Sequence, residues 1–182
     1  AACPLENGLE NKLRAARARV ESGECDTENV QPDTYGERGF ESPAALLEWL
    51  TANRPEETPV LTHGDYCLPN VFLKDGGVGG LIDLGRAGLA DRWQDIALCY
   101  RSLKSNLGWE SALPMRLFAE LGIAPDWEKI RYYISYFETV HAETACRWEG
   151  SQKLKNGAFS MPFPVYETQF LDFIDDISSS DL

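Results

Sequence analysis

Two aspartates and one asparagine are spaced as phosphoryl-transfer chemistry requires. Asp65 and Asn70 stand five positions apart in the segment HGDYCLPN. In the phosphoryl-transfer loop H-R-D-x-x-x-x-N, the aspartate accepts the proton of the substrate hydroxyl and the asparagine holds a magnesium ion. Asp83-Leu84-Gly85 occupies the place of the D-x-G sequence whose aspartate binds Mg²⁺ bridging the nucleotide phosphates. Carboxylate and amide oxygens are the ligands that Mg²⁺ prefers, so the pattern indicates magnesium-dependent phosphoryl transfer.

A short β-hairpin is expected to bring these residues together. The apolar runs at residues 71–73 and 78–82 flank the glycine-rich segment Lys74-Asp75-Gly76-Gly77. Because a hairpin returns the chain to its starting edge, Asn70 before it and Asp83 after it can face one site. An aspartate at the end of a strand often only accepts local backbone hydrogen bonds. The agreement of loop spacing, hairpin and downstream helix favours the functional interpretation.

Helices are predicted on both sides of this central segment. Each has an apolar stripe at helical spacing and a residue suited to one of its ends. Gly23 ends the first, Ser42 caps the second and Asn53-Arg54-Pro55 ends it, Gly108 and Gly122 end the next two, and Asp126 caps the last. The stripes are Leu5, Leu9, Leu13, Ala16 and Val20; Leu46, Leu47 and Leu50; Ile96, Ala97, Tyr100, Leu103 and Leu107; and Trp127, Ile130, Tyr133, Ile134 and Phe137. The predicted fold class is α+β, mainly α.

The tail raises a separate question. The segment GSQKLKNGAFSMPFPVY predicts a loop, and Phe170, Phe173, Ile174 and Ile177 then form a short amphipathic helical stripe. Packing back onto the domain and docking onto a partner are both open interpretations of this stripe.

Composition limits the function classes. Asp and Glu outnumber Lys and Arg by 29 to 17, which gives a formal net charge of −12. The electrostatic field of such an acidic chain repels nucleic acid and attracts cations. The acidity therefore either only aids solubility or helps to bind a cationic substrate. We expect no membrane span, no signal peptide and a cytoplasmic protein. The five cysteines are scattered without a C-x-x-C pair, which argues against a disulfide framework or a zinc site.

The sequence THGDYCLPNVFLKDGGVGGLIDLGRAGLADRWQDIALCYRS resembles the central signature of the aminoglycoside 3'-phosphotransferase family. Cys3-Pro4 with the helix that follows, the RPEE segment before the catalytic strand, and GIAPDWEKIRYYI are also similar to family sequence. The resemblance covers roughly residues 1–138 and implies the C-terminal lobe of a protein-kinase-like fold. Residues 139–182 form an unmatched tail.

The resemblance implies roles for individual residues. Asp65 would be the catalytic base, Asn70 and Asp83 the Mg²⁺ ligands, and Arg86 a cofactor-binding residue at the rim of the active site. Asp95 matches a helix residue that braces the catalytic loop by accepting backbone N–H groups. We expect His63 to be a satisfied loop or core histidine, and Cys67 and Leu68 to be packing residues. His141 has no evident partner.

The family binds polyamine sugars, which implies a cationic aminoglycoside as substrate and ATP with Mg²⁺ as cofactors. An acidic loop, with Glu21, Glu24, Asp26, Glu28 and Asp33, could meet ammonium groups or simply be solvated. Family members commonly finish with an Asp-Glu pair and an aromatic terminus. This chain has Phe137-Glu138 and continues for 44 residues.

The glycine-rich loop, strand lysine and adenine-binding hinge of a kinase are not found in the sequence, so the nucleotide lobe is expected to be absent. Alone, residues 1–182 should transfer phosphate negligibly. Two alternatives stay open. The acceptor could be another small alcohol such as a macrolide, choline or homoserine, or the chain could be a catalytically silent binding module.

Overall fold

The computed structural model describes residues 5–28, 30–31, 33–74, 77–107 and 111–140, and the backbone of two short strands, Gln152–Lys153 and Phe159–Ser160. The chain divides into two units. One comprises Ala1–Leu68 with Asp83–Ala145, and the other comprises Pro69–Ile82 with Cys146–Leu182. The described parts are mainly helical with small antiparallel sheets, as the sequence predicts.

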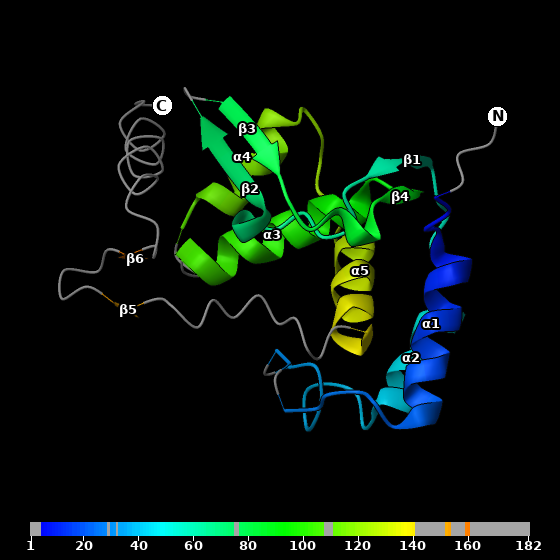
Figure 1. The fold of residues 1–182 in the computed structure, drawn as a ribbon. Coiled ribbons are helices and arrows are strands. Elements are labelled where there is room, and N and C mark those ends of the chain that lie inside the picture. The colour runs from blue at the N-terminus through cyan, green and yellow to red at the C-terminus, as the bar shows by residue number, and fades with distance from the viewer. Residues whose placement is uncertain are drawn as a thin grey trace. The chain divides into compact units, whose positions relative to one another are not determined.

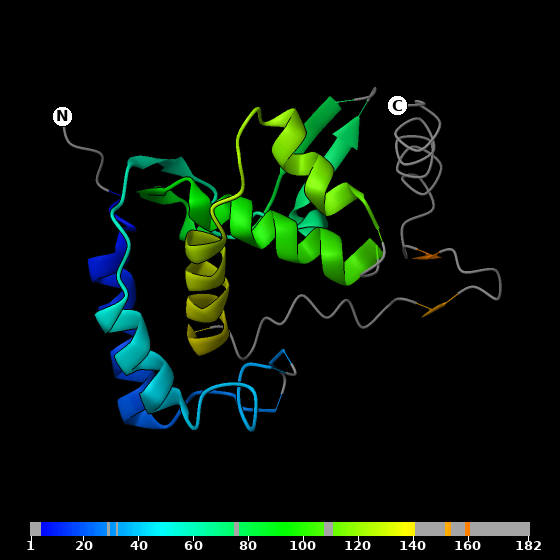
Figure 2. The same cartoon turned by 180° about the vertical axis from the view of Figure 1, so that it is seen from behind.

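The described residues of the first unit form five α-helices, and α5 packs against three of the others (Figures 1 and 2). They are α1 (Leu9–Ser22), α2 (Pro43–Ala52), α3 (Trp93–Leu107), α4 (Leu113–Glu120) and α5 (Trp127–Val140). The contacts of α5 with α1, α2 and α3 place it at the centre of the helical packing. The core lies where these helices meet and includes Leu9, Leu13, Leu46, Leu50, Ala97, Phe118, Ile130, Tyr132 and Tyr133.

The helix ends follow the capping residues that the sequence indicates. The Ser42 hydroxyl accepts the Ala45 N–H at 3.2 Å, and the Asp126 carboxylate accepts the Lys129 N–H at 3.0 Å. Gly23 ends α1 in the left-handed conformation at φ +73°.

Two residues expected on buried helix faces lie elsewhere. Leu5 precedes α1 and is exposed, because its segment pairs with the chain near Leu89 instead of joining the helix. Trp127, at the start of α5, is 49 % exposed and contacts the rings of Tyr100 and Phe118. Near the other end of the apolar stripe of α5, Tyr136 is buried as well as its neighbour Phe137, although only Phe137 was predicted to be buried.

A two-stranded antiparallel sheet in the first unit positions the loop after Thr62. Strand β1 (Pro59–Thr62) pairs with β4 (Gly88–Asp91), with Pro59 opposite Asp91 and Thr62 opposite Gly88. Strand β1 contains the apolar pair Val60-Leu61, whereas the sequence predicts no strand at β4, because four residues are too few to show a clear alternation. A 3-10 helix, η2 (Leu84–Arg86), leads into β4.

The second unit contains the predicted hairpin. Strand β2 (Val71–Lys74) pairs antiparallel with β3 (Gly77–Leu81), with Val71 opposite Leu81, and the register shifts between Phe72 and Leu73. A second pair, β5 (Gln152–Lys153) with β6 (Phe159–Ser160), lies in a segment predicted as a loop, so that prediction is wrong for four residues. The helical stripe at residues 170–177 and His141 lie outside the described residues.

No helix in the described part of the chain is long and apolar enough to cross a membrane.

Candidate functional site

The loop that carries Asp65 follows β1 and is fixed by side chains of α3. The Asp95 carboxylate accepts the backbone N–H of His63 at 2.7 Å and that of Gly64 at 2.9 Å. The Gln94 side-chain amide donates to the Gly64 carbonyl at 2.9 Å. These bonds attach three main-chain polar groups of His63 and Gly64 to one helix, and the predicted bracing role of Asp95 is confirmed.

Gly64 is required where the loop passes over Arg86. Its φ of +88° lies in the left-handed region, and a Cβ atom there would stand 2.1 Å from the Arg86 carbonyl oxygen. The loop backbone and the Arg86 backbone are therefore in direct contact. This contact brings the two segments that carry Asp65 and Arg86 together, although 21 positions separate those residues.

Asp65 is a buried carboxylate that faces a cation. The residue is 2 % exposed, and Oδ2 lies 3.1 Å from Nη1 of Arg86. Burial raises the pKa of Asp65, the Arg86 guanidinium opposes that rise, and the charge of Asp83 adds to it. The sequence-predicted residues Asp65, Asp83 and Arg86 thus belong to one electrostatically coupled group in the first unit.

Asp83 stands at the start of η2 in an uncommon backbone conformation. Its φ of 58° makes it the non-glycine residue with positive φ among the described residues, and its side chain is exposed. Aspartate tolerates this conformation better than most residues. The conformation and the exposure leave a carboxylate on the surface within the electrostatic range of Asp65.

Asn70 belongs to the second unit, where it is buried and precedes β2. Its backbone carbonyl accepts the Ile82 N–H at 3.1 Å, which closes the open end of the hairpin. The structure therefore brings together three of the four predicted site residues within one unit and places the fourth in the other. A common pocket for all four stays a prediction.

The carboxylate and amide oxygens of the candidate site suit a magnesium ion better than a softer metal. No group of three or more His, Cys, Asp or Glu side chains arranged for a metal occurs among the described residues. Mg²⁺ needs fewer protein ligands, because it keeps several waters and takes one or two carboxylates with substrate phosphates. Burial is the main cause of the raised pKa of Asp65, and the charge of Asp83 adds to it, so a cation beside the two carboxylates would favour their ionised forms.

The two ring nitrogens of His63 differ in their hydrogen bonding. It is 7 % exposed, its Nδ1 accepts the Asp65 N–H at 3.2 Å, and its ring meets the edge of Tyr66. Its buried Nε2 has no hydrogen-bond partner in the described part of the chain. The prediction of a loop histidine is therefore right for one nitrogen only. Cys67 is buried, as expected of a packing residue, whereas Leu68 is only half-buried.

The acidic residues proposed for substrate binding differ in their surroundings. Glu21, Glu24 and Glu28 are exposed, and Asp33 pairs with Arg38 at 3.0 Å. Glu138, by contrast, is 5 % exposed, and Arg101 lies 2.6 Å from its carboxylate. It also accepts the Gln31 N–H at 3.2 Å, so this acid ties a loop to α5. Burial raises the pKa of Glu138 and Arg101 opposes the rise.

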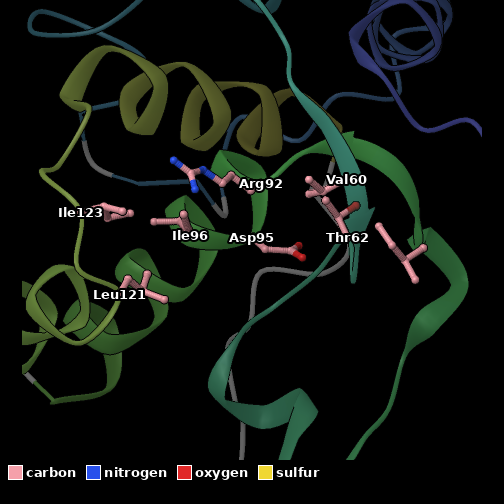
Figure 3. Close-up of a pocket in the computed structure, with 8 residues that line it drawn as sticks. Val60, Thr62, Arg92, Asp95, Ile96, Leu121 and Ile123 are labelled. Carbon is pink, nitrogen blue, oxygen red and sulfur yellow. The ribbon is translucent and has the colours of Figure 1, made fainter.

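A small pocket lies beside the brace of the loop (Figure 3). Its volume is about 260 Å³, and its lining is mostly aliphatic, from β1, α3 and the segment after α4. Asp95 is one lining residue, and Figure 3 shows its carboxylate directed toward the strand that carries Val60 and Thr62. The lining residues are Val60, Leu61, Thr62, Arg92, Asp95, Ile96, Leu121 and Ile123.

Two residues near the site were missed from the sequence. Asn7 donates from Nδ2 to the Arg86 carbonyl at 2.5 Å, and no local pattern marks it. Lys12 is 4 % exposed, and its Nζ donates to the Asn7 carbonyl. Helical spacing was a usable signal for Lys12, because it falls on the same face as Leu9, Leu13 and Ala16.

Comparison with known proteins matches the sequence resemblance. A family model described as "Phosphotransferase enzyme family" matches residues 1–133. An aminoglycoside 3'-phosphotransferase of Enterococcus faecalis is 43 % identical over 134 residues, which are 72 % of this chain and 49 % of that protein. A streptomycin 3''-kinase of Streptomyces griseus is 38 % identical over 147 residues, 74 % of this chain and 52 % of that one. The chain spans about half the length of the curated relatives it matches.

Solved structures agree with the fold class. An aminoglycoside-3'-phosphotransferase of type VIII is 34 % identical with a TM-score of 0.63, covering 75 % of this chain and 53 % of that one. An aminoglycoside phosphotransferase from Streptomyces rimosus, solved with ADP and streptomycin, is 26 % identical with a TM-score of 0.63. That likeness covers 76 % of this chain and 55 % of the other. The predicted family and the predicted kinase-like fold are both confirmed.

Proposed function

Because this chain belongs to the phosphotransferase enzyme family, we propose that it is the acceptor-binding lobe of an enzyme that phosphorylates a hydroxyl group of an aminoglycoside. The phosphoryl donor is ATP. The activity belongs to the whole protein, since the curated relatives are about twice as long as the matched region. Residues 1–138 form the lobe, and residues 139–182 form a tail without an assigned role.

The observation that carries the proposal is the ion pair between the buried Asp65 and the partly exposed Arg86, on a loop braced by Asp95. A general base must be ionised and must be aimed at the proton that it removes. Arg86 stabilises the ionised form of Asp65 against the effect of burial, and the Asp95 brace fixes the loop. Preorganisation of this kind is the main contribution that a protein makes to phosphoryl transfer.

In the reaction, Asp65 accepts the proton of the acceptor hydroxyl as the hydroxyl oxygen forms a bond to the γ-phosphorus. The bond from that phosphorus to the β–γ bridging oxygen breaks, and ADP leaves. Asn70 and Asp83 would hold magnesium, which neutralises phosphate charge when bound. Arg86 lies beside Asp65 and would also contribute positive charge toward the nucleotide phosphates.

The acceptor is a cationic aminoglycoside. The net charge of −12 and the exposed acids Glu21, Glu24 and Glu28 favour polycations over neutral alcohols. Two matched relatives are named for aminoglycosides or for streptomycin in particular. Glu138 does not contribute, because it is buried against Arg101.

The test uses the whole protein that carries this chain, assayed for ATP-dependent transfer to kanamycin- and streptomycin-like acceptors. Asp65→Asn should lower kcat by roughly 100-fold or more, in line with general-base catalysis. Asp126→Asn is the matched control, because asparagine also caps a helix and should leave kcat unchanged. An Asp65→Asn protein with kcat within tenfold of wild type would refute the role of the base.

The acceptor class is tested separately with a panel of aminoglycosides, a macrolide, choline and homoserine. Preference for choline, homoserine or the macrolide would keep the chemistry but replace the substrate. A wild-type protein that neither binds ATP nor turns over any acceptor would support the silent binding module instead.

A further inference from the structure

Arg86 is held at two points, and only one of them is a feature of the proposed chemistry. Its guanidinium faces Asp65 at 3.1 Å. Its backbone carbonyl accepts the side-chain N–H of Asn7 at 2.5 Å, from a residue 79 positions earlier in the chain. The second contact fixes the peptide group that directly follows the Arg86 Cα, the atom that carries the side chain.

Asn7 is itself held firmly. Its backbone N–H donates to the Leu89 carbonyl at 3.0 Å, and the Leu89 N–H donates to the Leu5 carbonyl at 2.7 Å. The backbone carbonyl of Asn7 accepts a hydrogen bond from the buried Lys12. The segment before α1 therefore forms an isolated parallel β-bridge with the chain that follows Arg86, and the backbone that carries the Asn7 side chain is fixed there.

The orientation of the Arg86 carbonyl matters because Gly64 lies directly against it. A hypothetical Cβ on Gly64 would be 2.1 Å from that oxygen and 2.5 Å from its carbon. Rotation of this peptide group would press it against the loop that carries Asp65 or withdraw Arg86 from Asp65. The Asn7 amide is the side-chain donor that opposes such rotation.

We propose that Asn7 is a positioning residue for phosphoryl transfer, which acts by fixing the Arg86 carbonyl and thereby the guanidinium that faces Asp65. The inference rests on the proposed function. It assigns Asn7 no contact with substrate or nucleotide. The effect of Asn7 on the reaction passes through Arg86.

The test compares Asn7→Ala and Asn7→Asp in the whole protein. Asparagine donates to the carbonyl, whereas aspartate of the same shape cannot, so both variants should lower kcat by about tenfold, as small misplacements of catalytic groups do. The KM for the aminoglycoside should stay within about twofold, because the acceptor contacts are unchanged. Asn7→Asp should lose at least as much kcat as Asn7→Ala, whereas a space-filling role would make alanine the worse variant.

Asn11 provides the matched control. Its Nδ2 also donates to a backbone carbonyl, that of Glu6 at 3.1 Å, but this hydrogen bond is exposed and does not involve Arg86. Asn11→Ala and Asn11→Asp should leave kcat at the wild-type level. Equal kcat for the Asn7 and Asn11 variants would overturn the inference.

A double-mutant cycle identifies the route of the effect. If Asn7 acts through Arg86, then Asn7→Ala should change kcat by less than about twofold in an Arg86→Ala background. A further tenfold loss there would contradict the proposal. Thermal unfolding of each variant separates loss of function from loss of fold, and Asn7→Asp keeps the volume if the alanine variant unfolds.

Failure of this inference and failure of the proposed function give different results. An inactive Asp65→Asn protein with fully active Asn7 variants would reject only the role of Asn7. A fully active Asp65→Asn protein would reject the catalytic assignment on which both depend.

Discussion

The Arg86 carbonyl oxygen occupies the space that a side chain on Gly64 would need, 2.1 Å from the ideal Cβ position. Real Cβ atoms do not approach a carbonyl oxygen so closely. The two backbones are thus in contact without room for even a methyl group. This contact, together with Asp95, sets the distance between the loop of Asp65 and the segment of Arg86.

Gly64→Ala should therefore destabilise the protein by about 3 kcal/mol or more, since left-handed strain of about 1–2 kcal/mol adds to a steric clash. Gly36→Ala is the matched control, because Gly36 has φ +92° but nothing within 4 Å of its Cβ position. It should show the strain alone. Chemical denaturation measures both, and a Gly64→Ala protein no less stable than Gly36→Ala would contradict the close contact.

Asp95→Asn should loosen the loop that carries Asp65 while preserving the shape of the side chain. An amide offers one accepting oxygen where the carboxylate offers two, so either His63 or Gly64 loses its acceptor. Loss of a buried charge-assisted bond should cost about 1–3 kcal/mol. Hydrogen exchange at the His63 and Gly64 amides should accelerate in this variant. Unchanged protection at both amides would rule out the brace.

The buried Lys12 predicts a dependence of stability on pH. Burial lowers the pKa of Lys12 from 10.5 to about 8, and the charges of Glu57 and Asp95 oppose that change. Between pH 8 and 10.5 the unfolded chain keeps the Lys12 proton that the folded chain has lost, so stability from this group rises with pH. Below pH 8 the folded state carries the full cost of the buried charge, about 3 kcal/mol.

Lys12→Met should accordingly be more stable relative to wild type at pH 7 than at pH 10.5. The difference in unfolding free energy between the two proteins should shift by about 3 kcal/mol across that range. Chemical denaturation at a series of pH values measures it, with Lys74→Met as the exposed-lysine control. A difference that does not vary with pH would mean that Lys12 is not buried in its charged form.

The sequence predicted those features that depend on neighbouring residues in the chain. Ser42 and Asp126 cap their helices by bonding amides three positions later, and the hairpin follows from two apolar runs around a glycine-rich turn. Asp65 and Asp83 stood out because their motifs have fixed spacing. The role of Asp95 came from the family resemblance instead of from local pattern.

The features that were missed depend on distant pairing. Strand β4 has four residues, and its conformation is set by its partner β1, 26 to 32 positions away. Asn7 reaches Arg86 across 79 positions, and nothing within its own neighbourhood indicates that contact. Trp127 fits the helical spacing of the apolar residues in α5. It is nevertheless exposed, because it lies in the first turn of the helix, at the edge of the core.

The left-handed backbone of Asp83 limits how this position can evolve. Glycine and asparagine can adopt φ of 58° at little cost, but neither carries a negative charge. Glutamate carries the charge but is not among the residues that favour this conformation. Aspartate alone satisfies both demands, the second of which follows from the proposed binding of Mg²⁺, so random substitution at position 83 should be tolerated less often than at an ordinary surface carboxylate.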